Sequence, residues 1–326
     1  MNRVGIAGMG LYVPSKVLAN ADFEAMVDTS DEWIVQRTGI RERRIANDDE
    51  WPSRMATAAA EQALAEAGVT PDDIDLIVCC TVSGDRLFPA TACEVGKNLG
   101  ALRAGGFDLS AACSGFVFGV NVAAQFVRTG TYRTVLVIGV EKLSSILDYT
   151  DRTTCVLFGD GAGAAVVTTF DRAGQGEYLS GDFGMEGGNE DTLMVPAGFA
   201  RQPASHETVD QRLHTMKMGG TKVFRFAVRT FHDQVRKALE PYGVDQLGIV
   251  IPHQVNLRII EAAAERLEMP MDKFFVNIDR YGNTSAASVP IALKEASEAG
   301  RLEKGKLVCL VAFGAGLTWG HSLLRW

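Results

Sequence analysis

The sequence predicts an α/β protein built from two similar halves. Strand-like apolar runs alternate with segments of helical periodicity along the whole chain, which is typical of layered α/β structures. The chain has 326 residues, of which 47% are hydrophobic and 22% are charged, so it is long enough to bury two core units. Related motifs recur in the same order in both halves, which indicates an internal duplication of about 150 residues.

Each expected element follows from its local pattern. Strands are expected where short apolar runs are bounded by turn residues, at 74–80, 134–140, 156–168, 248–251 and 307–313. Helices are expected where apolar residues recur with helical spacing, at 55–67, 114–129, 223–239, 256–267 and 286–299. A strand pattern also follows Met1 closely, so no secretory leader is expected. The Gly-rich polar stretch 171–188 is expected to join two domains, 1–171 and 172–326.

The two halves share a pattern of turn, helix, glycine and strand. Cys113 is followed 17 residues later by Gly130 and then a strand-like run. Asn283 is followed 17 residues later by Gly300 and then another strand-like run. We therefore expect Cys113 and Asn283 to occupy equivalent turns that face one shared pocket.

Cys113 is the strongest candidate for a reactive residue. It follows a strand-like stretch and precedes a helical pattern, where unpaired N–H groups and the helix dipole favour a thiolate. His253 and Asn283 lie on two further turns, and a Cys, a His and an Asn on three turns predict nucleophilic acyl transfer. The alternatives are a buried structural cysteine, a structural histidine and an asparagine that only adopts a left-handed turn.

Charge and cysteine usage exclude several classes of protein. The net charge of −8 argues against nucleic-acid binding, and no apolar run reaches the roughly 18 residues of a membrane span. The six cysteines include no C-x-x-C pair, which indicates a reducing cytoplasm and no metal site. The Gly-rich run 5–10 does not fit a dinucleotide fingerprint, because Pro14 interrupts the helix that should follow.

A basic segment stands out in this acidic chain. Residues 217–237 carry six Lys or Arg and one Asp. On a helical wheel Lys222, Arg225 and Arg229 fall within one narrow sector, opposite apolar side chains. Such a stripe favours an acidic macromolecular partner, with Arg258 extending it beyond the histidine turn; the alternative is a helix face that is only solvated.

The chain resembles the β-ketoacyl-acyl-carrier-protein synthase III family of thiolase-fold condensing enzymes. The resemblance spans nearly the whole length and rests on motifs at 28–34, 37–40, 108–115, 157–163, 252–258, 281–285 and 313–320. It implies a thiolase-like fold whose duplicated halves form a five-layered αβαβα subunit, usually in a homodimer. It further implies a cytoplasmic enzyme without metal or resident cofactor. That enzyme condenses an acyl-CoA primer with malonyl-acyl carrier protein, through an acyl-cysteine, to initiate fatty acid biosynthesis.

The resemblance also implies roles for individual residues. Cys113 matches the nucleophile, His253 and Asn283 match the pair that promotes decarboxylation, and the backbone at Cys113 and Ala315 matches the oxyanion hole. Phe88 matches a residue that reaches the acyl pocket of the partner subunit. Positions that contact CoA are matched by Trp33, Arg37, Arg152, Gly220, Phe224 and Asn256. Positions that bind acyl carrier protein are expected at Lys222, Arg225, Arg229 and Arg258.

Two departures from the family pattern leave the acyl primer open. Phe199 stands where a second glycine is frequent. In the loop 314–317, Ala315 stands where glycine is common and Leu317 where phenylalanine is common. Side-chain bulk near the pocket sets the chain length of the acyl group. The closest rival function is a relative from secondary metabolism that condenses or transfers unusual acyl groups. Rivals of other classes are a Cys–His thioesterase or hydrolase and a binding module in which Cys113→Ala would change nothing.

Overall fold

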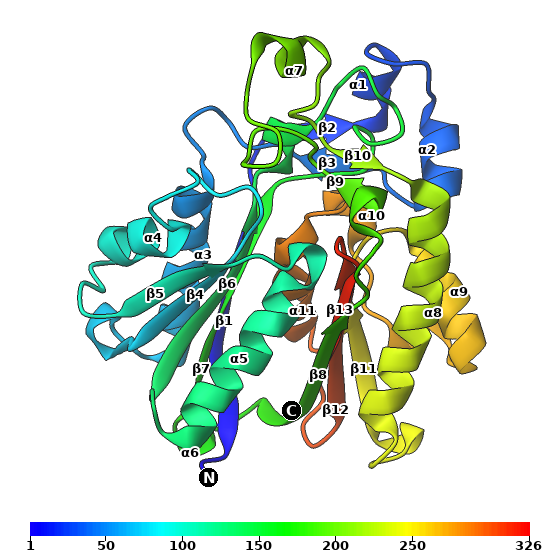
Figure 1. Cartoon of the computed structure of the whole chain (residues 1–326). Coiled ribbons are helices and arrows are strands. Elements are labelled where there is room, and N and C mark those ends of the chain that lie inside the picture. The colour runs from blue at the N-terminus through cyan, green and yellow to red at the C-terminus, as the bar shows by residue number, and fades with distance from the viewer.

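The subunit has five layers, in the order αβαβα. The computed structural model describes residues 1–326, apart from the side chain of Glu190. Figure 1 shows two β-sheets with the central helices α5 (Gly115–Thr129) and α11 (Ser288–Glu298) between them. Helices α3 (Pro52–Ala67) and α4 (Thr91–Leu99) cover the outer face of one sheet, and α8 (Gly220–Leu239) and α9 (Leu257–Leu267) cover the other. The expected layered fold is confirmed.

The first sheet has five strands in the order β1-β7-β6-β4-β5. Strand β4 is parallel to β5 and β6, whereas β7 is antiparallel to β6 and β1. The strands are β1 (Val4–Tyr12), β4 (Leu76–Cys80), β5 (Gly105–Leu109), β6 (Thr134–Glu141) and β7 (Gly161–Thr169).

The second sheet repeats this arrangement with four strands in the order β11-β12-β13-β8. Strand β11 is parallel to β12, and β13 is antiparallel to both β12 and β8, as in the first sheet. The counterpart of β5 is reduced to a single parallel bridge between Val250 and Phe274. The strands are β8 (Glu177–Met185), β11 (Leu247–Pro252), β12 (Leu307–Gly314) and β13 (Thr318–Arg325).

Three apolar cores hold the layers together. The central core packs Phe116 and Val120 of α5 and Leu293 of α11 between the sheets. Small residues let the outer layer approach closely: a Cβ at Gly10 would lie 2.1 Å from the carbonyl oxygen of Ala59 on α3. Burying a large apolar side chain contributes roughly 1.5–3 kcal/mol, so these cores fix the positions of the turns that carry polar groups.

Two sequence expectations need correction. The strand expected at 156–168 begins only at residue 161, because buried Asp160 accepts hydrogen bonds from the N–H groups of Ala46 and Ser144, so 156–160 form a loop. The stretch 171–188 is not merely a junction, since it contains β8. Strand β13 was not predicted, because its buried His321 and Ser322 hydrogen-bond to Gln234 and Asn121 and so hide its apolar pattern.

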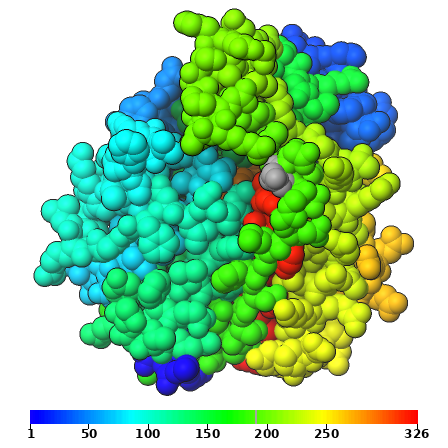
Figure 2. Space-filling model, viewed as in Figure 1, coloured from blue at the N-terminus to red at the C-terminus, as the bar shows by residue number. Residues whose placement is uncertain are grey.

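The remaining elements are short and lie mainly at one end of the molecule. The chain between β8 and α8 makes an excursion at 186–219, and its part around α7 stands at the top in Figures 1 and 2. No helix in the described part of the chain is long and apolar enough to cross a membrane. The short elements are β2 (Val17–Ala19), α1 (Asn20–Glu24), α2 (Asp31–Thr38), β3 (Glu42–Arg44), α6 (Phe170–Ala173), β9 (Leu193–Met194), α7 (His206–Asp210), β10 (Lys217–Met218) and α10 (Ile278–Tyr281).

Candidate active site

Cys113 lies on the strand-to-helix turn that the sequence predicts. Strand β5 ends at Leu109, a single 3-10 turn spans Ala112–Ser114, and α5 begins at Gly115. Ala112 adopts a left-handed backbone with φ of 46°, a conformation that costs on the order of 1 kcal/mol and often marks functional sites. The hydroxyl of Thr318 on β13 lies 3.2 Å from the Ala111 carbonyl oxygen, so the second half of the chain supports this turn.

His253 follows β11 and points a neutral imidazole into the interior. Its backbone N–H donates to the carbonyl of Val311 at 2.8 Å, and its ring packs edge-on against Phe313, with 5.7 Å between ring centres. Both ring nitrogens are buried and have no hydrogen-bond partner among the residues described. Burial lowers the pKa of His253 to about 3, so the ring carries one N–H donor and one lone pair at neutral pH.

Asn283 lies between α10 and a 3-10 turn at Ser285–Ala287. Its backbone N–H donates to Leu157 at 2.9 Å, and its carbonyl accepts from the N–H of Gly159 at 3.0 Å. Its side-chain Oδ1 accepts from the N–H of Ser285 at 2.9 Å, which fixes the amide and leaves its NH2 group available as a donor. The local backbone therefore presents Asn283 as a hydrogen-bond donor.

The two turns are equivalent, but Cys113 and Asn283 do not occupy the same position in them. Ser285 has φ of 48° and opens the 3-10 turn before α11, as Ala112 does before α5. The counterpart of Cys113 is thus Ala286, three residues after Asn283. The count of 17 residues to the next glycine misleads because α11 has 11 residues whereas α5 has 15.

The structure brings the three candidate residues together. Cys113, His253 and Asn283 line one narrow cavity, which is otherwise apolar. A wider cavity of about 620 Å³ reaches Cys113 as well, with walls that include 81–84, 86–87, 145–146 and 193–195. The sulfur therefore lies where two cavities meet. The other residues of the narrow cavity are Leu157, Phe158, Leu193, Met218, Val223, Phe226, Val255, Phe313, Gly314 and Leu317.

The protonation state expected for Cys113 is wrong for the resting protein. The position at a helix N-terminus predicts a thiolate. Burial instead raises the pKa of the Cys113 thiol to about 12, and a hydrogen bond with Ser285 offsets only part of that effect. The residue is 6% exposed, so losing the hydration of a thiolate outweighs the local dipole. The resting site holds a neutral thiol and a neutral imidazole.

The sequence analysis did not single out three polar residues beneath the site, namely Glu141, Ser285 and Ser288. Glu141 ends β6 and is fully buried, and Ser285 donates to it at 3.2 Å. The backbone N–H of Gln254 donates to the hydroxyl of Ser288 at 2.7 Å, which joins the histidine turn to α11. The signal for Glu141 was a single acidic residue at the end of an otherwise apolar strand.

Trp33 lies in a cluster of arginines on the surface. The guanidinium carbon of Arg37 lies 4.7 Å from the centre of the Trp33 ring, and that of Arg152 lies 5.4 Å from it. Arg152 also forms an ion pair with Asp28 at 3.1 Å. The arrangement combines one aromatic face with two cations, which suits a base and its phosphates.

Asn256 stabilises the start of α9, in addition to the contact with CoA that the resemblance implies. Its Oδ1 accepts from the N–H of Arg258 at 2.9 Å and caps α9, and its Nδ2 donates to the carbonyl of Arg37 at 2.9 Å. Gly220 and Phe224 begin α8, but neither lines the two cavities at Cys113, whereas Val223 and Phe226 of the same helix do.

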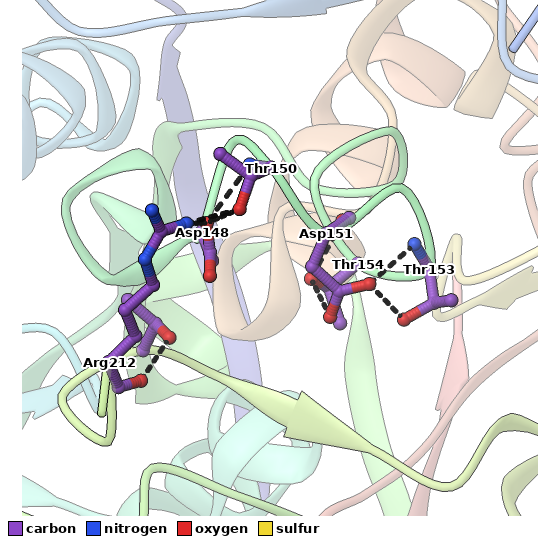
Figure 3. A network of polar contacts seen from close by, with 7 residues as sticks. Asp148, Thr150, Asp151, Thr153, Thr154 and Arg212 are labelled. Atoms are coloured by element: carbon purple, nitrogen blue, oxygen red, sulfur yellow. Dashed lines mark hydrogen bonds and ion pairs between the residues drawn. The ribbon is translucent and has the colours of Figure 1, made fainter. Parts of the chain in front are cut away.

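Figure 3 shows a polar network around the loop that carries Arg152. Arg212, from the excursion, donates to the carboxylate of Asp148 at 2.9 Å, and Asp151 accepts from the N–H of Thr153 at 2.9 Å. The N–H of Met216 also donates to the carbonyl of Ile146 at 2.8 Å. The loop and the excursion are thus joined to each other beside the wider cavity.

The other predicted residues lie as follows. Lys222, Arg225, Arg229 and Arg258 are all exposed, and Arg229 lies 3.4 Å from Glu186. Phe88 is 78% exposed beside Leu87, which lines the wider cavity. Ala315 and Phe199 line the wider cavity, and Leu317 lines the narrow one. No group of three or more His, Cys, Asp or Glu side chains in the described structure is arranged to hold a metal ion.

Two family models match successive parts of the chain. The model described as 3-Oxoacyl-[acyl-carrier-protein (ACP)] synthase III matches residues 107–187, which include Cys113. The model described as 3-Oxoacyl-[acyl-carrier-protein (ACP)] synthase III C terminal matches residues 238–326, which include His253 and Asn283.

Similar proteins match over nearly their whole length. The Beta-ketoacyl-[acyl-carrier-protein] synthase III of Caldanaerobacter subterraneus subsp. tengcongensis is 53% identical over 99% of this chain and 97% of the relative. That of Symbiobacterium thermophilum is also 53% identical, over 99% and 98%. The crystal structure of 3-oxoacyl-[acyl-carrier-protein] synthase III from Aquifex aeolicus VF5 has a TM-score of 0.90 and 46% identity, and the match covers 99% of this chain and 100% of that one.

Proposed function

The chain belongs to the β-ketoacyl-[acyl-carrier-protein] synthase III family, and from this premise we propose how its residues carry out the condensation that initiates fatty acid biosynthesis. The enzyme is an acyltransferase that joins an acyl-CoA primer to malonyl-acyl carrier protein, with loss of CO2. The observation that carries the assignment of roles is that Cys113, His253 and Asn283, from three separate turns, line one narrow cavity.

In the first half-reaction Cys113 takes the acyl group from acyl-CoA. Its sulfur loses the thiol proton as it attacks the thioester carbon, and CoA leaves as a thiolate that takes up a proton from the solvent. The backbone N–H groups of Cys113 and Ala315 stabilise the oxyanion of the tetrahedral intermediate. The turn geometry supports this role, because Gly314 packs its backbone directly against Cys113 and places Ala315 next to it.

In the second half-reaction His253 and Asn283 stabilise the enolate that forms when malonyl-acyl carrier protein loses CO2. Decarboxylation places negative charge on the thioester oxygen, and two neutral donors can bind that oxygen without removing a proton. The low pKa of His253 keeps its imidazole neutral, and Ser285 fixes the amide of Asn283 as a donor. The enolate carbon then attacks the acyl carbon and releases the sulfur of Cys113.

The substrates approach over different surfaces. We assign the nucleotide of CoA to the cluster of Trp33, Arg37 and Arg152, with Gly220, Phe224 and Asn256 beside the pantetheine channel. We assign the acidic carrier protein to the exposed cations at Lys222, Arg225, Arg229 and Arg258. No resident cofactor is needed, since the thiol, the two donors and the oxyanion hole supply every step.

We further propose a cytoplasmic homodimer of these subunits. Strand β5 pairs only with β4, so its other edge is free, and an unprotected strand edge tends to pair with another chain. Leu87 and Phe88 are exposed large apolar residues, and Leu87 lines the wider cavity together with Asp108 of β5. Phe88 would enter the wider cavity of the partner. A reducing cytoplasm is supported by six free thiols.

Intact-mass spectrometry with a panel of acyl-CoAs tests the assignment. The wild type should gain one acyl group, Cys113→Ala should gain none, and addition of malonyl-acyl carrier protein should convert the adduct to a 3-oxoacyl product. Release of free acid without carbon–carbon bond formation would favour the thioesterase. A strong preference for unusual primers would favour the relative from secondary metabolism.

A further inference from the structure

Glu141 is a buried carboxyl group that the proposed mechanism leaves without a task. It ends β6 and is 0% exposed. Five donors surround it: the hydroxyls of Thr81, Ser83 and Ser285 and the N–H groups of Val82 and Ser83. Burial of a carboxyl group without a cation is costly, so its retention beside an active site calls for a chemical reason.

Ser285 connects this carboxyl group to the nucleophile. Its hydroxyl lies 3.2 Å from Oε1 of Glu141, and the same side chain lowers the pKa of the Cys113 thiol against the effect of burial. Ser285 and Cys113 line the same wider cavity. The serine is held in a left-handed backbone with φ of 48°, which is rare outside glycine and asparagine. A strained turn thus places one hydroxyl against a carboxylate and in the same cavity as a thiol.

His253 is a poor candidate for accepting the thiol proton. Neither of its ring nitrogens hydrogen-bonds to Cys113 or to any other described residue. Burial also lowers its pKa to about 3, whereas burial raises the pKa of Glu141 to about 7 against the hydrogen bonds from its neighbours. A general base works best when its pKa lies near the working pH. The titratable groups whose charge is coupled to Glu141 are the thiols of Cys79, Cys80 and Cys113, all with raised pKa values.

We propose that Ser285 and Glu141 form a proton relay for Cys113, in which Glu141 holds the thiol proton for as long as an acyl group occupies the sulfur. The proposal rests on the function proposed above. Ser285 lines the same cavity as the reacting thiol and is the first member of the relay, and Glu141 acts through it.

Protons and electron pairs balance through both half-reactions. As the bond from sulfur to the acyl carbon forms and the bond to CoA breaks, the thiol proton moves to Ser285 and the hydroxyl proton of Ser285 moves to Glu141. During condensation the acyl carbon leaves the sulfur, which departs with its electron pair as a thiolate. Ser285 then returns a proton to it and recovers one from Glu141. The cycle ends with a neutral thiol and an ionised carboxylate.

The decisive experiment measures the rate of acylation of Cys113 by acetyl-CoA, or by whichever longer acyl-CoA the wild type accepts best, from pH 5.5 to 9. The relay needs an ionised Glu141, so the wild-type rate should rise with pH through about 7 and then level off. Ser285→Ala should lower the rate at pH 7.5 by about 10²-fold and abolish the inflection. Decarboxylation of malonyl-acyl carrier protein should stay at the wild-type rate, because the backbone N–H of residue 285 still holds Asn283.

Two further variants separate the relay from folding effects. Glu141→Gln should lower the acylation rate by the same factor. Because the change also disturbs the donors of 81–83, circular dichroism checks that this variant is folded. If Glu141→Gln is unfolded, the result for Ser285→Ala decides. Ser144→Ala is the matched control: Ser144 donates to another buried acid, Asp160, at 2.6 Å, and neither residue lines the cavities at Cys113. It should keep the wild-type rate and inflection.

Three results would overturn the proposal. Ser285→Ala could acylate at the wild-type rate, or it could slow while keeping the wild-type inflection, which would make the serine a packing residue only. A wild-type protein that gains no acyl group at Cys113 would instead overturn the proposed function, and the relay with it.

Discussion

The turn before α5 and the turn before α11 have the same backbone and different chemistry. Each opens with a non-glycine residue in the left-handed region, Ala112 or Ser285, and continues through a 3-10 turn into a central helix. In the proposed mechanism the first presents the nucleophile, whereas the second presents a donor amide and a hydroxyl. A duplicated backbone has therefore supplied one geometry for two complementary tasks.

Strands β6 and β12, which lie beside these turns, also match in position and differ in the chemistry of their last residue. Strands β6 and β12 each have eight residues, and their last residues, Glu141 and Gly314, are structural counterparts. Glu141 of the first half contacts Ser285 of the second, whereas Gly314 of the second half packs against Cys113 of the first, where a Cβ would lie 2.8 Å from the Cys113 nitrogen. Each half thus supports the turn of the other, and neither could be altered alone without affecting both.

Replacing the nucleophile should have the largest effect on this comparison. Cys113→Ser should reduce condensation by more than about 10³-fold, because loss of a nucleophile removes the whole covalent pathway. Product formation by liquid chromatography and the intact mass after acyl-CoA treatment measure it. An acyl adduct that persists on another residue would contradict the assignment of the first turn.

Removing the donors should separate the two turns. His253→Ala and Asn283→Ala should each reduce decarboxylation of malonyl-acyl carrier protein by about 10²–10³-fold, the usual cost of one oxyanion donor. Self-acylation of Cys113 should be largely retained, because it does not use them. Release of labelled CO2 and intact mass give the two rates; slow acylation with normal decarboxylation would reverse the division of labour.

Gly314→Ala tests whether the second half holds the first turn. The added Cβ would lie 2.8 Å from the Cys113 nitrogen and 3.1 Å from its Cβ, so the turn must shift, at a cost of about 1–3 kcal/mol. We expect a lower melting temperature and slower acylation. Gly187→Ala, where a Cβ would meet nothing within 4 Å, serves as the control. Wild-type acylation by Gly314→Ala would show that the turn does not depend on this contact.

Charge reversal should have the smallest effect and extends the comparison to the surface. Arg225→Glu and Arg258→Glu should raise KM for malonyl-acyl carrier protein several-fold, because charge attraction mainly speeds association, and added salt should shrink the difference. KM for acyl-CoA should stay near wild type. Trp33→Ala and Arg152→Ala should show the opposite preference. Equal losses for both substrates in all four variants would indicate a shared folding defect.

Much of the layered fold could be predicted from the sequence, since helices such as α5 and strands such as β6 carry strong apolar periodicity. The three candidate residues could be singled out because each lies on a turn after an apolar run. The thiol's protonation state could not, because burial depends on residues distant in sequence that close over it. Glu141 and Ser285 escaped notice for the same reason: 144 residues separate them, and only the packed sheets make them neighbours.

The excursion at 186–219 lies outside both sheets, yet it contributes Leu193, Met194, Val195, Phe199 and Met216 to the wider cavity. It is joined to the 143–150 loop by Arg212 and Met216 rather than by the duplicated cores. Mutations in the excursion can change the shape of the wider cavity, which we propose holds the primer. The turns before α5 and α11, and the contacts that each half makes with the turn of the other, would stay unchanged. Related proteins can therefore come to use different acyl chains, and so to make different lipids or other products, while the residues that form the carbon–carbon bond stay the same.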